Sequence, residues 1–234
     1  MTQAAQTIEP QKNARFDTPR DAARFNMIEQ QIRTWEVLDP VVLELFNTVP
    51  RENFVAESQV GLAFADVELP IGEGQTMLSP KLEGRILQAV EVKKTDKVLL
   101  VGTGSGYLTA LLATLAAHVH AVEIYPALSA IAKSRFNQQN IHNVTLHVAD
   151  AVNGYAAAAP YDVIIFTGSL QLRPTAVEKM LNVGGRLFAV IGELPIMQAT
   201  LTQHVSEGAY HHETLFETCL PALENAPQAN KFEF

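Results

Sequence analysis

From residue 97 to about residue 192, short apolar runs alternate with stretches of helical periodicity. The apolar runs predict buried strands at 98–101, 119–124, 144–149, 161–167 and 186–192. The stretches between them predict helices at 106–116, 126–137 and 174–181. Strands rich in Val and Leu without polar alternation are typical of a parallel sheet covered on both faces. The order of strands and helices therefore predicts an α/β fold with a doubly wound, mostly parallel sheet and right-handed crossovers.

The C-terminal part departs from this alternation. Residues 198–205 and 214–220 are strand-like and are separated by a turn region, which predicts an antiparallel pair. Together with the five parallel strands, this pair gives a sheet of seven strands. The sole cysteine, Cys219, lies in the second of these runs, so we expect it to be buried. Residues 224–234 are predicted to be a frayed polar tail.

The N-terminal part is predicted to be helical. Apolar positions between Phe25 and Trp35, and again from 42 to 49, have helical spacing. Asp39 and Pro40 predict the N-cap and first residue of the second helix. Residues 65–79, rich in Gly and Pro, predict a loop that leads into a helix opened by Ser79 and Pro80. Residues 1–18 are polar, and we expect them to be flexible.

A glycine-rich turn follows the first predicted parallel strand, in residues 98–107, VLLVGTGSGY. Glycines at 102, 104 and 106 permit positive φ and remove Cβ atoms that would hold a ligand away from the backbone. The next helix directs its N-terminal amides at whatever lies over the turn. Glu123, at the end of the following strand, is 21 residues beyond Gly102, where a carboxylate can accept from two ribose hydroxyls. The segment predicts a nucleotide site.

The glycine spacing indicates which nucleotide. Dinucleotide sites use G-x-G-x-x-G, whose third glycine lets a helix pack close to a pyrophosphate. Here the pattern is G-x-G-x-G, and Tyr107 stands at that third position. The spacing argues against NAD or FAD and favours a ligand without a pyrophosphate, such as S-adenosylmethionine.

Composition narrows the class of protein. The chain has 234 residues, 47% hydrophobic and 18% charged, which suits a globular core. The net charge is −8 and there is no Lys- or Arg-rich run, so we expect no nucleic-acid partner. We find neither a signal peptide nor a membrane span, and a single cysteine fits a reducing cytoplasm. The acidic charge fits a monomer or a homodimer equally.

The chain resembles the protein-L-isoaspartate O-methyltransferases over about residues 26–220. Besides VLLVGTGSGY, the segments that carry the resemblance are MIEQQIR (27–33), VPRENFV (49–55), LPIGEGQT (69–76), APYDVII (159–165) and LNVGGRL (181–187). The most specific is LPIGEGQT, followed by Pro80, which is similar to the family's substrate loop P-x-G-x-G-Q-T-I-S-x-P. The resemblance implies an S-adenosylmethionine-dependent methyltransferase fold that repairs isoaspartyl-containing peptides or proteins by methylating their free α-carboxylate.

The resemblance also implies roles for individual residues. It implies that Glu123 binds the ribose, that Asp150 faces the adenine and that Ala151 also contacts the cofactor; the alternative for Asp150 is to cap the next turn. It also implies that Gln75, Thr76 and Lys81 contact the substrate, and that Thr76 and Ser79 have catalytic roles. The alternative for Ser79 is to cap the helix that begins at Pro80. The methionine end of the cofactor is carried to the glycine turn, at Gly102, Thr103, Gly104 and Gly106. No metal ligand is implied.

Two positions depart from the family pattern. The acid that usually precedes the first glycine, and that helps anchor the cofactor's ammonium group, is Leu100. Its loss predicts weaker or differently arranged cofactor binding. Leu78 stands where the substrate loop carries a hydroxyl. These departures leave open two alternatives: a methyltransferase with another acceptor, and a noncatalytic binding or regulatory protein.

We expect four regions along the chain. They are a flexible N-terminus (1–18), N-terminal helices with the substrate loop (19–95), the S-adenosylmethionine-binding α/β domain (96–223) and the polar tail (224–234).

Overall fold

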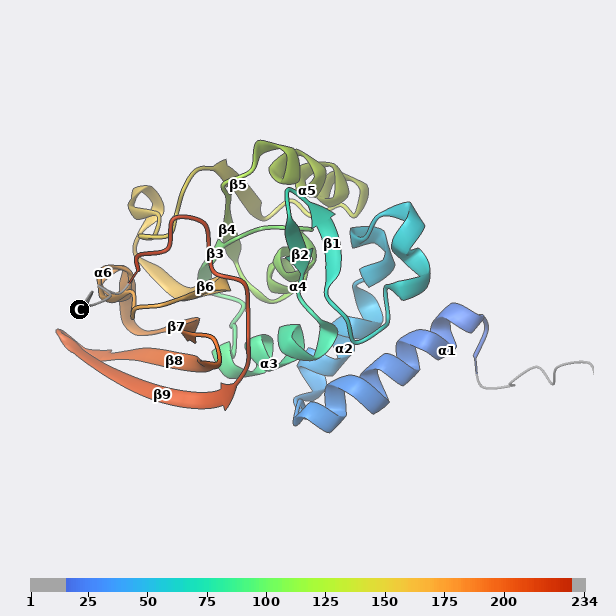
Figure 1. Cartoon of the computed structure of the whole chain (residues 1–234), viewed down its shortest axis with the longest axis horizontal. Helices are drawn as coiled ribbons and strands as arrows, with labels where there is room; N and C mark the ends of the chain where they lie inside the picture. Colours follow the sequence, from blue (N-terminus) through green and yellow to red (C-terminus); the bar gives the residue numbers. More distant parts are fainter. Residues whose placement is uncertain (1–15, 229–234) are drawn as a thin grey trace, which may run out of the picture.

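A sheet of seven strands organises the part of the chain that the computed structural model describes, residues 16–228 (Figure 1). Its spatial order is β5-β4-β3-β6-β7-β8-β9. The strands are β3 (Lys97–Val101), β4 (His118–Glu123), β5 (Val144–Val148), β6 (Tyr161–Leu170), β7 (Leu181–Glu193), β8 (Ile196–Ser206) and β9 (Ala209–Glu217). The first five strands in this order, from β5 to β7, pair in parallel. Strand β8 is antiparallel to both of its neighbours, β7 and β9. The predicted fold class, including the antiparallel pair, is confirmed.

Both faces of the sheet are buried. Along β3, Val98 and Leu100 belong to one apolar cluster, and Leu99 and Val101 to another. This alternation follows from the two-residue period of a strand, so each face needs its own cover. The helices of this region are α3 (Pro80–Val90), α4 (Tyr107–Leu115), α5 (Pro126–Gln138) and α6 (Thr175–Glu178). The helix predicted at 174–181 is thus shorter than expected, because the chain already pairs with β6 at Leu181.

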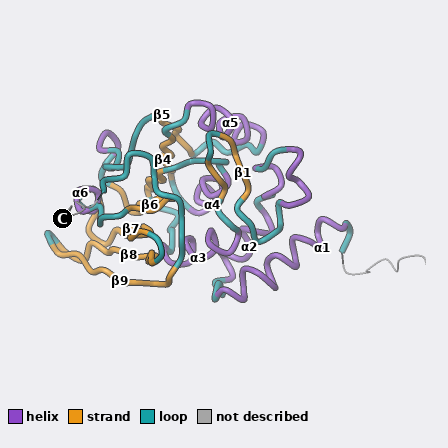
Figure 2. The backbone as a smooth tube through the Cα atoms, viewed as in Figure 1, coloured by secondary structure: helices purple, strands orange, loops and turns teal. Residues whose placement is uncertain are grey.

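The N-terminal part is helical, as predicted (Figure 2). Its elements are α1 (Pro19–Asn26), η1 (Met27–Ile32), η2 (Arg33–Trp35), α2 (Pro40–Thr48), η3 (Arg51–Phe54) and η4 (Glu57–Leu62). Asp39 caps α2 as expected, since its Oδ1 accepts from the amide of Val41 at 2.7 Å. Thr18, the last residue of the segment expected to be flexible, caps α1 through a reciprocal pair of bonds with Asp21. Residues 1–15 lie outside the described part.

The prediction of a loop over 65–79 is wrong for residues 69–77, which form two short strands and their turn. Residues Leu69–Gly72 (β1) and Gln75–Met77 (β2) form an antiparallel hairpin, with Leu69 opposite Met77. The turn places Gly72, Glu73 and Gly74 at positive φ, which glycine adopts at little cost. Strands of three and four residues are too short to show an alternating pattern, so the sequence did not indicate them.

The segment after β9 also differs from the prediction. Strand β9 ends at Glu217, and Cys219 is exposed rather than buried. The chain then returns to the end of β6, where Ser169 donates its amide to Pro221 O and accepts the amide of Leu223. The predicted polar tail therefore begins as an ordered segment beside β6. Residues 229–234 lie outside the described part.

A histidine pair on the parallel strands makes stability depend on pH. His120 Nδ1 lies 3.2 Å from His147 Nε2. Burial, with the nearby His118, His147 and Lys97, lowers the pKa of His120 to about 4. An unfolded histidine takes a proton near pH 6.5, so the stability associated with neutral His120 is complete above that pH and is lost as the pH falls toward 4.

We expect the free energy of unfolding to fall by about 1 kcal/mol across this range, because His120 is only partly buried and solvent screens its charge. Urea unfolding at pH 7.5 and pH 5 measures the difference. His120→Gln should show a smaller difference than the wild type. An equal difference in both proteins would assign the acid sensitivity to other groups.

Candidate active site

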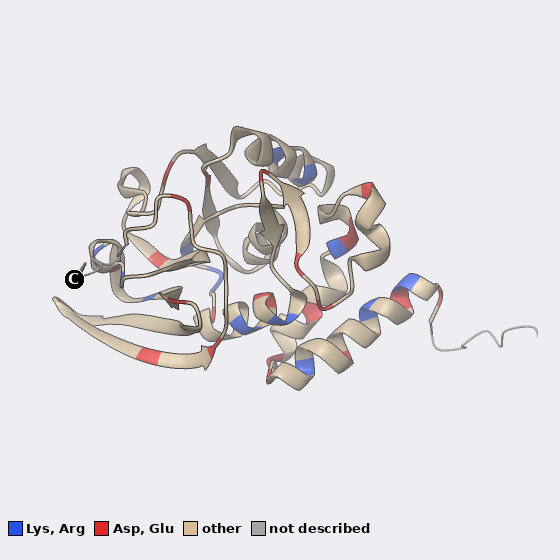
Figure 3. Cartoon of the chain, in the orientation of Figure 1, with Lys and Arg blue, Asp and Glu red and all other residues tan. Residues whose placement is uncertain are grey.

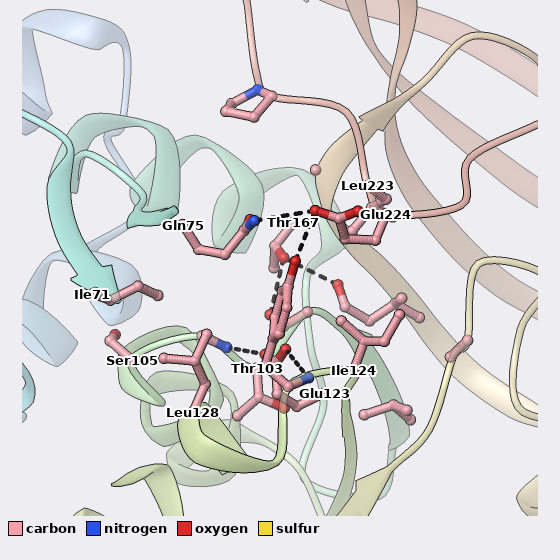
Figure 4. A pocket seen from close by; sticks show the side chains of 18 of the residues that line it. Ile71, Gln75, Thr103, Ser105, Glu123, Ile124, Leu128, Thr167, Leu223 and Glu224 are labelled. Atoms are coloured by element: carbon pink, nitrogen blue, oxygen red, sulfur yellow. Dashed lines mark hydrogen bonds between the residues drawn. The ribbon is translucent and has the colours of Figure 1, made fainter. Parts of the chain in front are cut away.

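A cavity opens at the carboxyl ends of the parallel strands, where the strand order reverses between β3 and β6. In doubly wound sheets this reversal is the usual ligand site. About 950 Å³ of empty space lies within the cavity and its open mouth. Its wall comes from the β1–β2 hairpin, α3, the ends of β3 to β6 and the segment after β9 (Figure 4).

The glycine turn forms the floor next to β3. Gly102 has a φ of +91°, and a Cβ there would lie 2.1 Å from Thr167 Oγ1 on β6. That hydroxyl donates to the carbonyl oxygens of Val101 and Gly102, at 3.1 and 2.9 Å. Position 102 therefore requires glycine both for its backbone angle and for the closeness of β6. Gly104 has a φ of +53° and also lines the cavity.

The other two turn residues differ in placement. Thr103 lines the cavity, and its buried Oγ1 has no hydrogen-bond partner among the described residues. Gly106, which was expected to hold the ligand, is not part of the wall. It is the N-cap residue of α4, and a Cβ there would lie 3.0 Å from Phe136 Cε1 on α5. Its φ of +88° and the closeness of α5 both favour glycine there, independently of any ligand.

Glu123 lies at the end of β4 with only 4% of its surface exposed. Its Oε2 accepts the amide of Gly104 at 2.8 Å, and its Oε1 accepts the amide of Tyr125 at 3.1 Å. A carboxylate has about four lone-pair positions, so both oxygens can still accept from a ligand. The two amides hold the carboxylate rigidly toward the cavity, which is the arrangement a ribose diol needs.

Asp150 and Ala151 line the cavity beyond β5. Asp150 Oδ1 accepts the amide of Val152 at 3.0 Å, so the capping role left open by the sequence is present. Its Oδ2 accepts from Asn225 Nδ2 at 2.8 Å. Asp150 therefore stabilises its own turn and presents the same carboxylate edge to the cavity.

The hairpin supplies the opposite wall. Gln75 and Thr76 both line the cavity, and Thr76 Oγ1 donates to Glu68 Oε2 at 3.2 Å. Gln75 Nε2 lies 3.4 Å from Glu224 Oε1, which also accepts from the hydroxyl of Tyr125 at 2.8 Å (Figure 4). Glu224 thus links the hairpin to the loop after β4. Sequence reasoning missed this residue because nothing local marks a tail that folds back over a site.

Two residues expected at the site are not in its wall. Ser79 is buried at the N-cap position of α3, where its side chain makes no capping hydrogen bond. Lys81 Nζ lies 2.7 Å from Asp66 Oδ2 and 4.2 Å from the centroid of the Trp35 ring. The structure therefore brings Gln75 and Thr76 to the cavity but not Ser79 or Lys81.

A buried ion pair lies behind the hairpin. Arg51 is 1% exposed and contacts the carboxylate of Glu83, which lines the cavity. Arg51 also donates to Ala63 O at 2.9 Å and to Leu78 O at 2.6 Å. Burial raises the pKa of Glu83 to about 7, against the lowering effect of the Arg51 charge. The sequence did carry a signal for this pair, because Glu83 shares the apolar face of α3 with Leu87 and Val90.

The two departures from the family pattern have different surroundings. Leu78 lines the cavity with an apolar side chain. Leu100 is fully buried in the cluster that includes residues of α3 and α4, and it is not part of the wall.

Comparison with known proteins identifies the family. The family model described as protein-L-isoaspartate(D-aspartate) O-methyltransferase matches residues 22–220. The protein-L-isoaspartate O-methyltransferase of Protochlamydia amoebophila is 40% identical over 190 residues, 81% of this chain and 90% of that protein. That of Picosynechococcus sp. is 36% identical over 195 residues, 82% and 88% of the two chains.

Solved structures agree with the sequence comparisons. A protein-L-isoaspartate O-methyltransferase structure superposes with a TM-score of 0.75 at 25% identity, covering 86% of this chain and 66% of that one. A second, from Plasmodium falciparum and in complex with S-adenosyl-L-homocysteine, superposes with a TM-score of 0.73 and covers 87% and 97%. At 18% identity, the second likeness supports the fold alone. With the cavity at the sheet's switch point and the matched motifs, these findings show that the chain belongs to the protein-L-isoaspartate O-methyltransferase family.

Proposed function

We propose that this chain is an S-adenosylmethionine-dependent methyltransferase that methylates the free α-carboxylate of isoaspartyl residues in damaged proteins. The observation that carries the cofactor assignment is the buried Glu123 carboxylate, held by two backbone amides and turned toward the cavity. The buried, unpartnered hydroxyl of Thr103 in the same wall fits a polar ligand. The family to which the chain belongs carries the reaction assignment.

The cofactor would occupy the wall formed by β3, β4 and β5. Glu123 would accept from the ribose hydroxyls, and Asp150 and Ala151 would face the adenine. Gly102, Thr103 and Gly104 would hold the methionine end. When bound, S-adenosylmethionine supplies a methyl group on a positively charged sulfur.

The substrate would approach from the hairpin, with Gln75 and Thr76 as its contacts. One oxygen of the isoaspartyl carboxylate forms a bond to the methyl carbon while the carbon–sulfur bond breaks, so a carboxylate and a sulfonium become an ester and a thioether. No proton moves in this step, so the chain needs no general base. Its residues act by aligning the carboxylate with the methyl group and excluding water. The nitrogen of the following peptide bond then attacks the ester carbonyl and methanol leaves, which gives a succinimide. Water opens this ring in part to normal aspartate.

We also propose isoaspartyl peptides or proteins, rather than nucleic acid, as the partner. The net charge is −8, which disfavours binding to a phosphate backbone. Acidic and basic residues both occur on the helices of the chain (Figure 3). No helix in residues 16–228 is long and apolar enough to cross a membrane. We propose that the chain acts in the cytoplasm as a monomer or homodimer, with residues 19–95 facing the substrate and residues 96–223 binding the cofactor.

Two assays test the function. Calorimetric titration with S-adenosylhomocysteine should give micromolar binding, and transfer of a labelled methyl group should occur to an isoaspartyl peptide but not to the matching aspartyl peptide. Binding without methylation of either peptide would indicate a different acceptor. Absence of binding would indicate a noncatalytic role for the fold.

We expect Glu123→Ala to weaken S-adenosylhomocysteine binding by about 1.5–3 kcal/mol, because two hydrogen bonds from the ribose to a charged acceptor are lost. Calorimetry measures the change. Glu207→Ala, at an exposed turn position, is the matched control and should bind as the wild type does. An unchanged dissociation constant for Glu123→Ala in a folded protein would remove the ribose assignment.

A further inference from the structure

The site contains an acidic residue for which the family pattern gives no role. The pattern places an acid two residues before the first glycine, at the position of Leu100 in this chain. That acid helps to anchor the ammonium group of the cofactor's methionine moiety. Here Leu100 occupies that position and is fully buried among apolar side chains. An ammonium group in a cavity that excludes water needs an anionic partner, so another carboxylate must serve if the cofactor is to bind well.

Four acidic side chains line the cavity, and three of them are committed elsewhere. Glu123 accepts the amides of Gly104 and Tyr125 and is assigned above to the ribose. Asp150 uses both oxygens within its own corner, on Val152 and Asn225. Glu224 is exposed at the mouth, bonded to Tyr125. The fourth, Glu83, remains.

Glu83 is held in place by its buried ion pair with Arg51. It is 1% exposed, and Arg51 holds its Oε2, while Oε1 has no hydrogen-bond partner among the described residues. The same cavity wall includes Gly102 and Thr103, whose Oγ1 is also without a partner there. Glu83 therefore lines the same cavity as the turn that would carry the methionine end, with Oε1 outside its contact with Arg51.

The position of Glu83 explains how it could replace the missing acid. Its neighbours on α3, Leu82 and Ile86, belong to the same apolar cluster as Leu100. Helix α3 therefore covers the face of the sheet toward which the side chain of Leu100 points. From that face, Glu83 reaches the cavity wall.

We propose that Glu83 binds the ammonium group of the cofactor's methionine moiety, in place of the acid absent at Leu100, and that Arg51 positions the Glu83 carboxylate. The inference rests on the proposed cofactor and adds the residue that recognises its charged end. The alternative is that Glu83 only neutralises Arg51.

The test compares two ligands that differ by one group: S-adenosylhomocysteine and its deaminated analogue, in which hydrogen replaces the amino group. Glu83→Gln keeps the shape of the side chain and an acceptor for Arg51. It should weaken S-adenosylhomocysteine binding roughly ten- to a hundredfold, since a hydrogen bond between charged groups is lost. Its affinity for the deaminated analogue should stay within about twofold of the wild type. Calorimetry measures both constants.

Equal losses for the two ligands, or no loss for either, would overturn the proposal and leave Glu83 as the counter-ion of Arg51. Failure of the wild type to bind either ligand is a separate outcome, which would reject the proposed cofactor itself. Thermal unfolding of the ligand-free variant verifies that it is folded.

A second variant tests the relocation directly. Glu83→Leu should lose the preference for S-adenosylhomocysteine over its deaminated analogue, and adding Leu100→Glu should restore it. A folded double variant without that preference would overturn the equivalence of the two positions.

Discussion

Replacing Arg51 by methionine is expected to lower the free energy of unfolding by about 3–5 kcal/mol, the range measured when one partner of a buried ion pair is removed. Methionine keeps much of the apolar volume but leaves the carboxylate of Glu83 buried without its cation. The carbonyl oxygens of Ala63 and Leu78 would lose their donor as well. These contacts join η3, the end of η4 and the start of α3, so we expect the loss to affect the whole N-terminal part.

Urea unfolding of three further variants separates charge from packing. Arg51→Met with Glu83→Leu removes both charges and should recover a large part of the lost stability, because no uncompensated charge remains. Arg33→Met breaks an exposed pair with Glu29 and should lower stability by about 1 kcal/mol or less. If Arg51→Met lowered the free energy of unfolding no more than Arg33→Met does, the buried pair would not stabilise the fold. Arg51 could then not hold Glu83 in place as we propose.

The sequence predicted the sheet because its signals are local. An apolar run such as Val98–Val101 indicates a strand buried on both faces, whatever the rest of the chain is. A glycine such as Gly102 indicates a turn with positive φ in the same way. The seven strands, the antiparallel C-terminal pair and the N-terminal helices followed from such signals. The β1–β2 hairpin did not, because its pairing is shorter than the pattern that would reveal it.

The site was predicted only in part because some of its wall comes from segments distant in the sequence. Glu123 and Asp150 follow strands, and strand ends in a parallel sheet meet at one edge. Glu224 reaches the cavity from beyond β9, and no local pattern announces that return. Gly106 lies in the same motif but outside the wall, and its positive φ and the nearby Phe136 are a structural reason for glycine that the motif alone does not reveal.

Replacing Gly102 by alanine is expected to lower the free energy of unfolding by about 2–5 kcal/mol, from two causes. A non-glycine residue at positive φ costs roughly 1–2 kcal/mol. The new Cβ would also lie 2.1 Å from Thr167 Oγ1, and forcing such a contact apart in a packed core costs about 1–3 kcal/mol. S-adenosylhomocysteine binding should weaken too, because any shift of β3 from β6 moves the turn.

Two matched variants distinguish the causes, with urea unfolding as the measurement. Gly208→Ala lies at a φ of +71° with nothing within 4 Å of its new Cβ, so it should show the backbone cost alone. Thr167→Ala leaves only the Cβ of residue 167, at 3.5 Å from the new atom, so Gly102→Ala should be less damaging in that background than in the wild type. If the losses of unfolding free energy for Gly102→Ala and Thr167→Ala were simply additive, the clash would contribute nothing. The need for glycine at 102 would then come from the backbone angle alone. The expected non-additivity would show that β6, through Thr167, helps to fix the shape of the glycine turn.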